Sequence, residues 1–184
     1  MALPDHAAAL ALLYQHTQSQ SLRHHAFAVE ACCRAYAPEA ERELWGMAGL
    51  LHDFDYERWP SLPDHPLQGN QILTQLGYPE PLRRAILAHC EQTGVRRESP
   101  LDKTLFACDE LAGFLTACAL VKPSKKLTDV ELPSIRRKLK DKAFARGVNR
   151  ADIDRGAAEL ELPLDTHILN CLRAMQAIAP TLGL

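Results

Sequence analysis

The dipeptide His52-Asp53 closes the apolar run 44–51 and places an imidazole beside a carboxylate where a helix should stop. A neutral imidazole and a carboxylate together suit a divalent cation that takes both nitrogen and oxygen ligands. Burying this pair without a cation would require other partners for its polar groups. Further residues of the same two chemical types occur on both sides of the dipeptide: His25, His65, His89 and Asp109. Their order in the chain leads to the hypothesis of a metal site.

Helical geometry separates the two adjacent histidines of the segment 22–29. Each residue advances about 100° around a helix axis, so His25 falls within the apolar stripe that Leu22, Ala26 and Val29 form. His24 points the opposite way. His25 is therefore predicted to face inward, either as a ligand or as a core imidazole with a hydrogen-bonded partner.

Two later histidines differ in their surroundings. His89 shares a helix face with Leu82 and Ile86, so it too is predicted to face the core, as a ligand or as a hydrogen-bonded imidazole. His65 lies in the proline-rich connection 59–66, where either a ligand or a solvent-exposed loop residue is expected.

Asp109 lies at the shoulder of an apolar helix face, among alanine, cysteine and leucine. It is either a solvated edge residue or a buried carboxylate, and close packing would make an uncompensated charge costly. Together the candidates supply four imidazoles and two carboxylates, enough for two cations if Asp53 bridges them. Such a set suits one or two ions of Mn, Fe, Co, Ni or Zn. Paired metals activate a water and hold a phosphoryl group, which is the chemistry of a phosphohydrolase.

The elements that must position these residues are predicted to be helices. Apolar residues recur every three and four positions, β-branched clusters are scarce, and proline or glycine punctuates the chain every 15 to 25 residues. The pattern predicts an all-α fold of about eight or nine helices, over roughly 5–16, 20–37, 39–53, 67–76, 80–92, 101–121, 133–145, 150–160 and 164–179.

Length and composition are those of one compact domain spanning residues 1–184. The chain is 47% hydrophobic and carries a formal net charge of −2, which implies no general attraction to nucleic acid or acidic membranes. The six cysteines include no Cys-x-x-Cys pair, and most lie in apolar helical patterns, as small core residues do. The start of the chain lacks the pattern of an export signal, and no apolar run is long enough to span a membrane. We expect a cytoplasmic protein.

Charge is unevenly distributed along the chain. Residues 122–150 contain ten Lys or Arg and three acidic residues, so they carry +7 and the remainder carries −9. These cations could anchor an anionic substrate, and the candidates are Lys122, Lys125, Lys126 and Arg146. A solvated helix face is the alternative. The lack of interleaved aromatic residues and the acidic remainder do not favour a nucleic-acid partner.

The order His25, His52-Asp53, Asp109 resembles the H…HD…D pattern of the HD superfamily of metal-dependent phosphohydrolases. The resemblance covers about residues 20–120, and residues 122–184 form a basic helical extension outside it. The chain is also similar to HDIG-type bacterial predicted hydrolases. Phe54-Asp55 replaces the isoleucine-glycine part of that label. The resemblance implies His25, His52, Asp53 and Asp109 as a single-metal set, and His65 and His89 as the extra ligands of binuclear members. Gly77-Tyr78-Pro79 spells a cyclic-dinucleotide phosphodiesterase signature outside its usual context, and is predicted to be a turn.

The leading functional hypothesis is a phosphohydrolase that acts on a small phosphate ester, a nucleotide or a related compound. Asp53 and Asp55 are the predicted catalytic residues. Asp55 or Glu57 is expected to orient the attacking water or a ligating histidine. Two alternatives use the same residues differently: a di-iron oxygenase resembling myo-inositol oxygenase, and a non-catalytic module that senses a nucleotide through a retained metal pocket.

Overall fold

The structure, a computed structural model, describes residues 4–62 and 64–184, and this part of the chain contains helices and no β-strand. The all-α prediction is confirmed. The α-helices are α1 (His6–His16), α2 (Gln20–Tyr36), α3 (Arg42–Leu51), α4 (Asp64–Gln75), α5 (Glu80–His89), α6 (Pro100–Leu120), α7 (Leu132–Lys140), α8 (Arg150–Glu159), α9 (Leu164–Ala177) and α10 (Ala179–Leu182). Three 3-10 turns join them at Glu39–Glu41, Glu91–Thr93 and Leu127–Asp129.

Side-chain caps explain where several of these helices begin. Asp5 accepts a hydrogen bond from the Ala8 amide at the start of α1, and Ser19 caps α2. At the start of α6, Ser99 and Asp102 each accept a hydrogen bond from the other's backbone amide, which is a capping box. These caps fix the register of the two helices, α2 and α6, that carry His25 and Asp109.

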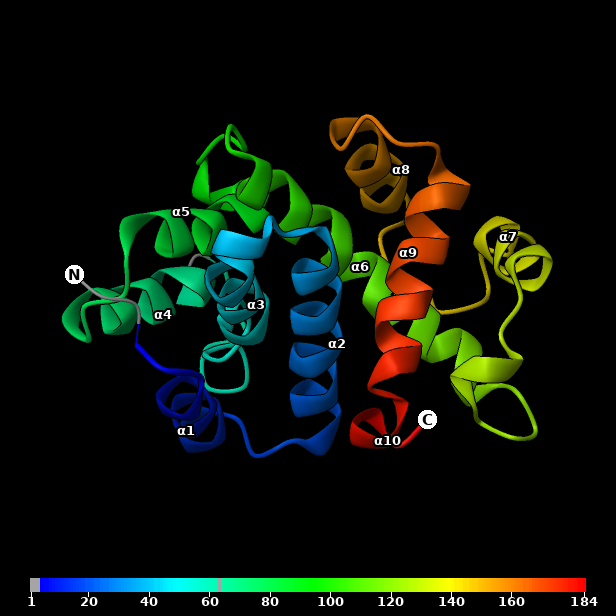
Figure 1. Cartoon of the computed structure of the whole chain (residues 1–184), viewed down its shortest axis with the longest axis horizontal. Coiled ribbons are helices and arrows are strands. Elements are labelled where there is room, and N and C mark those ends of the chain that lie inside the picture. Colours follow the sequence, from blue (N-terminus) through cyan, green and yellow to red (C-terminus); the bar gives the residue numbers. More distant parts are fainter. Residues whose placement is uncertain (1–3, 63) are drawn as a thin grey trace.

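The long helix α6 lies at the centre of the packing. It contacts α2, α5, α8 and α9, while α2 also packs along α3. Figure 1 shows α2 and α3 side by side, with α4 and α5 at one end of the molecule and α7 at the other. Phe54 and Phe114 are among the largest fully buried side chains of the shared core. None of the described helices combines the length and apolar character that crossing a membrane requires.

Glycines allow the closest helix contacts. A Cβ added at Gly49 would lie 2.8 Å from the Val29 carbonyl oxygen and 2.9 Å from the Glu30 Cα. Only a residue without a side chain therefore permits this approach of α3 to the backbone of α2. The approach brings the end of α3, where His52 lies, next to α2.

The predicted helix 133–145 ends earlier than expected, at Lys140. The carbonyl oxygens of Leu139 and Asp141 accept hydrogen bonds from the Arg150 guanidinium, at 3.1 and 3.0 Å. Asp141 also accepts one from the Ala143 amide, a local turn that competes with helix. The predicted last helix, 164–179, corresponds to α9, which ends at Ala177 and is followed by the short helix α10.

Two smaller predictions are confirmed. Five of the six cysteines are buried, and only Cys90 is partly exposed. Gly77-Tyr78-Pro79 forms the turn between α4 and α5, where Gly77 has a positive φ of 78°.

Candidate metal centre

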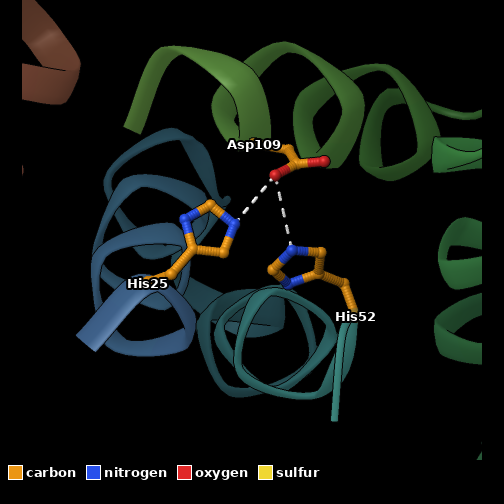
Figure 2. A group of neighbouring side chains, drawn as sticks. All are labelled: His25, His52 and Asp109. Atoms are coloured by element: carbon orange, nitrogen blue, oxygen red, sulfur yellow. Dashed lines mark hydrogen bonds and ion pairs between the residues drawn. The ribbon is translucent and has the colours of Figure 1, made fainter. Parts of the chain in front are cut away.

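One group of possible ligands joins three helices. His25 comes from α2, His52 follows the last residue of α3, and Asp109 lies in the middle of α6. The Oδ1 atom of Asp109 lies 2.9 Å from His25 Nε2 and 3.5 Å from His52 Nε2. Figure 2 shows the two imidazoles converging on this carboxylate. Three donor atoms thus face a common point.

A second group lies beside the first. His65 at the start of α4 and His89 at the end of α5 both face Asp53. Their Nε2 atoms lie 3.2 and 3.5 Å from the Oδ1 atom of Asp53. The His52 ring contacts the His25 and His89 rings edge-on, with centroids 5.1 and 5.3 Å apart, so the two groups are contiguous.

Asp53 lies between the two groups. Its Oδ2 atom is 3.4 Å from His52 Nε2 and 4.0 Å from His25 Nε2, while its Oδ1 atom faces His65 and His89. Each carboxylate oxygen therefore faces a different group. This is the arrangement that a carboxylate bridging two cations would need.

The outer nitrogens of three imidazoles are held by acceptors. The Nδ1 atom of His52 is 2.7 Å from the Gly49 carbonyl oxygen, and that of His89 contacts the Ile86 carbonyl oxygen. The Nδ1 atom of His65 is 2.7 Å from Asp55 Oδ1. Such contacts orient a ligating imidazole and leave Nε2 available for a metal.

Asp55 is itself held in place. It is 1% exposed, and its Oδ2 atom accepts a hydrogen bond of 2.7 Å from the Gly69 amide. A Cβ at Gly69 would lie 2.7 Å from this carboxylate, so glycine permits the contact. Asp55 therefore orients His65 in this structure, which is one of the two roles expected for it. Its predicted catalytic role, like that of Asp53, stays a prediction.

His52 provides the test of whether these residues fit a metal. Its side chain is fully buried, and its Nε2 atom has no hydrogen-bond partner among the described residues. A buried polar atom without a partner is costly. The atom lies 3.4 and 3.5 Å from the carboxylates of Asp53 and Asp109 without hydrogen-bond geometry, so a cation bound among them would satisfy it. The mixed imidazole and carboxylate donors fit a divalent transition metal.

The cluster is strongly coupled electrostatically. Burial opposes charge on His52, but Asp53 and Asp109 raise the pKa of this imidazole well above its usual value. Burial opposes ionisation of Asp53 and Asp109 too, yet the neighbouring histidines hold both carboxyl pKa values below their usual range. Burial also opposes charge on His65, and hydrogen bonds to Asp53 and Asp55 raise its pKa to about 9. Without a metal, His52 and His65 therefore favour their protonated forms.

An open pocket of about 300 Å³ gives access to the cluster. Besides five of the six candidate ligands, Tyr56, Glu110 and Gly113 line it. Burial and the neighbouring Asp109 raise the pKa of Glu110 to about 7. Sequence reasoning missed Tyr56 and Glu110, because neither residue type nor spacing distinguishes them. Glu110 could have been found from its position directly after Asp109, because consecutive residues of a helix are only about 100° apart around the axis and can border the same site.

The other predicted residues lie elsewhere. Glu57 accepts hydrogen bonds from the Gln18 and Ser19 amides, at 2.6 and 3.0 Å, and so holds the α1–α2 connection. Lys122, Lys125 and Lys126 follow α6, whose end at Leu120 lies roughly 16 Å beyond Asp109 along the helix. Arg146 lies in the α7–α8 connection. None of these four cations lines the pocket, and their role in substrate binding stays a prediction.

The comparisons with known proteins agree with this site. The family model described as HD domain matches residues 22–113, which is half of the chain and spans His25 through Asp109. No curated protein and no solved structure gave a significant match. The chain belongs to the HD-domain family.

Proposed function

We propose that this protein is a metal-dependent phosphohydrolase that acts on a small phosphate ester, a nucleotide or a related compound. The main support is that the six candidate ligands form two groups of three, with one oxygen of Asp53 facing each group. HD-domain proteins are in general metal-dependent phosphohydrolases, and membership of the family supports the same activity.

The residues of this chain have distinct parts in that chemistry. When bound, two divalent cations lower the pKa of a water and stabilise the charge that develops on a phosphoryl group. His25, His52 and Asp109 would hold one cation, and His65 and His89 the other, with Asp53 between them. Asp55 keeps the Nε2 atom of His65 directed toward Asp53.

The pocket walls supply further polar groups. The Glu110 carboxylate and the Tyr56 hydroxyl line the opening and can form hydrogen bonds to a bound ester. The ring of Tyr56 packs edge-on against His65, with centroids 5.3 Å apart, which positions it at the second group of ligands.

The test starts with metal analysis of protein purified without a metal-affinity tag. Phosphomonoesters and phosphodiesters are then assayed with added Mn²⁺ or Co²⁺. We expect activity that His52→Ala and Asp53→Ala abolish. His24→Ala is the matched control, because His24 lies next to His25 on α2 but outside the ligand groups. A metal-loaded protein that is inert on every ester would contradict the proposal.

A di-iron oxygenase is the second candidate, because four imidazoles and two carboxylates with a shared bridge also suit two irons. The same preparation separates the two functions. Two equivalents of iron and oxygen consumption with a substrate would support the oxygenase, whereas ester hydrolysis without oxygen uptake supports the hydrolase.

A further inference from the structure

The connection between α7 and α8, residues 141–149, is organised by one side chain. The guanidinium of Arg150 donates hydrogen bonds to a series of carbonyl oxygens in and around this loop: Leu139, Asp141, Phe144, Ala145 and Val148. The loop lacks regular secondary structure, but the hydrogen bonds from the Arg150 guanidinium fix its backbone.

The loop is docked on α6 at two points, and one of them, Glu110, lines the pocket. The ring of Phe144 packs edge-on against Phe114, with centroids 5.5 Å apart. The Asn149 amide donates a hydrogen bond of 3.1 Å to Glu110 Oε2. Glu110 and Phe114 are four residues apart and so share one face of α6.

The stretch of α6 around these two points borders the pocket. Glu110 and Gly113 both line it, and a Cβ at Gly113 would lie 4.0 Å from the His25 ring. Residues 145–148 connect the docking point at Phe114 to the one at Glu110. Arg146 therefore lies within three residues of the contact between this loop and a pocket-lining residue, and its side chain is exposed.

Charge distinguishes Arg146 from its surroundings. Asp53, Asp109 and Glu110 line the pocket, and none of the described lining residues is Lys or Arg. No ion pair engages Arg146 within the described part of the chain. Two other cations of the basic stretch are occupied: Arg136 pairs with Asp165 at 2.7 Å, and Lys138 lies 4.2 Å above the Phe144 ring.

We propose that loop 141–149 is the substrate-recognition element of this site, and that Arg146 binds a second anionic group of the substrate. The inference rests on the proposed function. The reacting phosphoryl group belongs at the ligand cluster, whereas a guanidinium on the adjoining loop would bind a carboxylate or second phosphate farther along the molecule. A guanidinium binds either group through two parallel hydrogen bonds. The substrate class is a phosphate ester with a further anion on its other portion.

The experiment compares two phosphonates that the enzyme cannot hydrolyse as esters. 2-Carboxyethylphosphonate carries a second anion, and 3-hydroxypropylphosphonate has a neutral hydroxyl instead. Binding to Mn²⁺-loaded protein is measured by calorimetry, with metal content checked before and after. We expect the wild type to bind the carboxylate compound about ten-fold more tightly. Arg146→Ala should abolish this preference, and Arg146→Lys should retain part of it.

Lys126→Ala is the control, because it removes an exposed cation of the same basic stretch beyond the far end of α6. It should leave the preference unchanged. A wild type without preference, or an Arg146→Ala variant that keeps it, overturns the inference while leaving ester hydrolysis intact. Conversely, a preference that depends on Arg146 in a protein that hydrolyses no ester would support the recognition element and refute the proposed function.

Discussion

The buried Asp55 is the residue whose role in the metal centre can be isolated most cleanly. It touches His65 and the Gly69 amide but is not among the residues lining the pocket. Asp55→Asn should weaken binding at the group of His65, His89 and Asp53 by roughly 10- to 100-fold, because His65 loses its charged partner. Metal titration should show little change at the group of His25, His52 and Asp109.

Asp64→Asn is the control for this change, since Asp64 is nearby but only reaches Gln68 at 3.5 Å. Equal losses at both groups in Asp55→Asn would indicate general unfolding of the site rather than misorientation of His65.

Proton release on metal binding is a second prediction at the residue scale. The pKa of His65 is about 9 in the metal-free protein, above the ordinary value of 6.5, so this imidazole is protonated at pH 7. A metal must displace that proton, and affinity should therefore rise with pH up to about pH 9. Calorimetry in buffers of different ionisation enthalpy measures the protons released. A pH-independent affinity would contradict the prediction.

The same shift links stability of the metal-free protein to pH. A folded-state pKa above the unfolded value means that the folded state holds the proton more tightly. The stabilisation is complete below about pH 6.5 and is lost as the pH rises toward 9. Urea denaturation of metal-free protein across this range measures it, and His65→Gln should remove this part of the pH dependence.

At the scale of the elements, the contact between α2 and α3 decides whether the first group of ligands assembles. Gly49→Ala would place a Cβ against the backbone of Val29 and Glu30, which cannot move as a side chain does. We expect a loss of about 1–3 kcal/mol in the free energy of unfolding, together with weaker metal binding, because α2 is displaced from His52.

Gly113→Ala is the matched stability control. The nearest atom to its added Cβ is 4.0 Å away, and alanine favours helix over glycine, so its stability should be unchanged or slightly higher. Denaturation midpoints of the two variants measure the difference. If both glycine variants are equally stable, the close approach of α2 and α3 does not require Gly49.

For the whole molecule, metal should act as a clamp on the fold. The six candidate ligands come from α2, α4, α5, α6 and the segment after α3, so a bound metal would connect elements far apart in sequence. At a free metal concentration near 100 times Kd, binding contributes about 2.7 kcal/mol. For a domain of this size that corresponds to a rise in Tm of roughly 5–10 °C, lost on chelation.

Thermal denaturation with and without a chelator measures this effect. His52→Ala should show a much smaller rise in Tm, because it removes a ligand at the contact between the two groups. A rise of the same size in His52→Ala would mean that the stabilising metal binds elsewhere.

The local sequence pattern predicted most of the helices and the directions in which several candidate ligands point. The helical phases of His25 and His89 put both on apolar faces, because helix geometry relates sequence spacing to direction without knowledge of the partner helix. The end of the apolar run 44–51 predicted that a helix stops at His52-Asp53, and α3 does end at Leu51. The early end of α7 was not, because its cause is Arg150, ten residues farther along the chain.

By itself, the sequence determined an all-α chain, a set of six candidate ligands and the presence of a basic stretch, since each follows from residue type and short-range periodicity. Only the tertiary structure divided the ligands into two groups of three and turned one oxygen of Asp53 toward each. It also separated Arg146, in the loop that contacts Glu110, from the three lysines beyond the end of α6. These arrangements depend on distances between helices, which are set by long-range packing such as the contact at Gly49 and not by the spacing of residues along the chain.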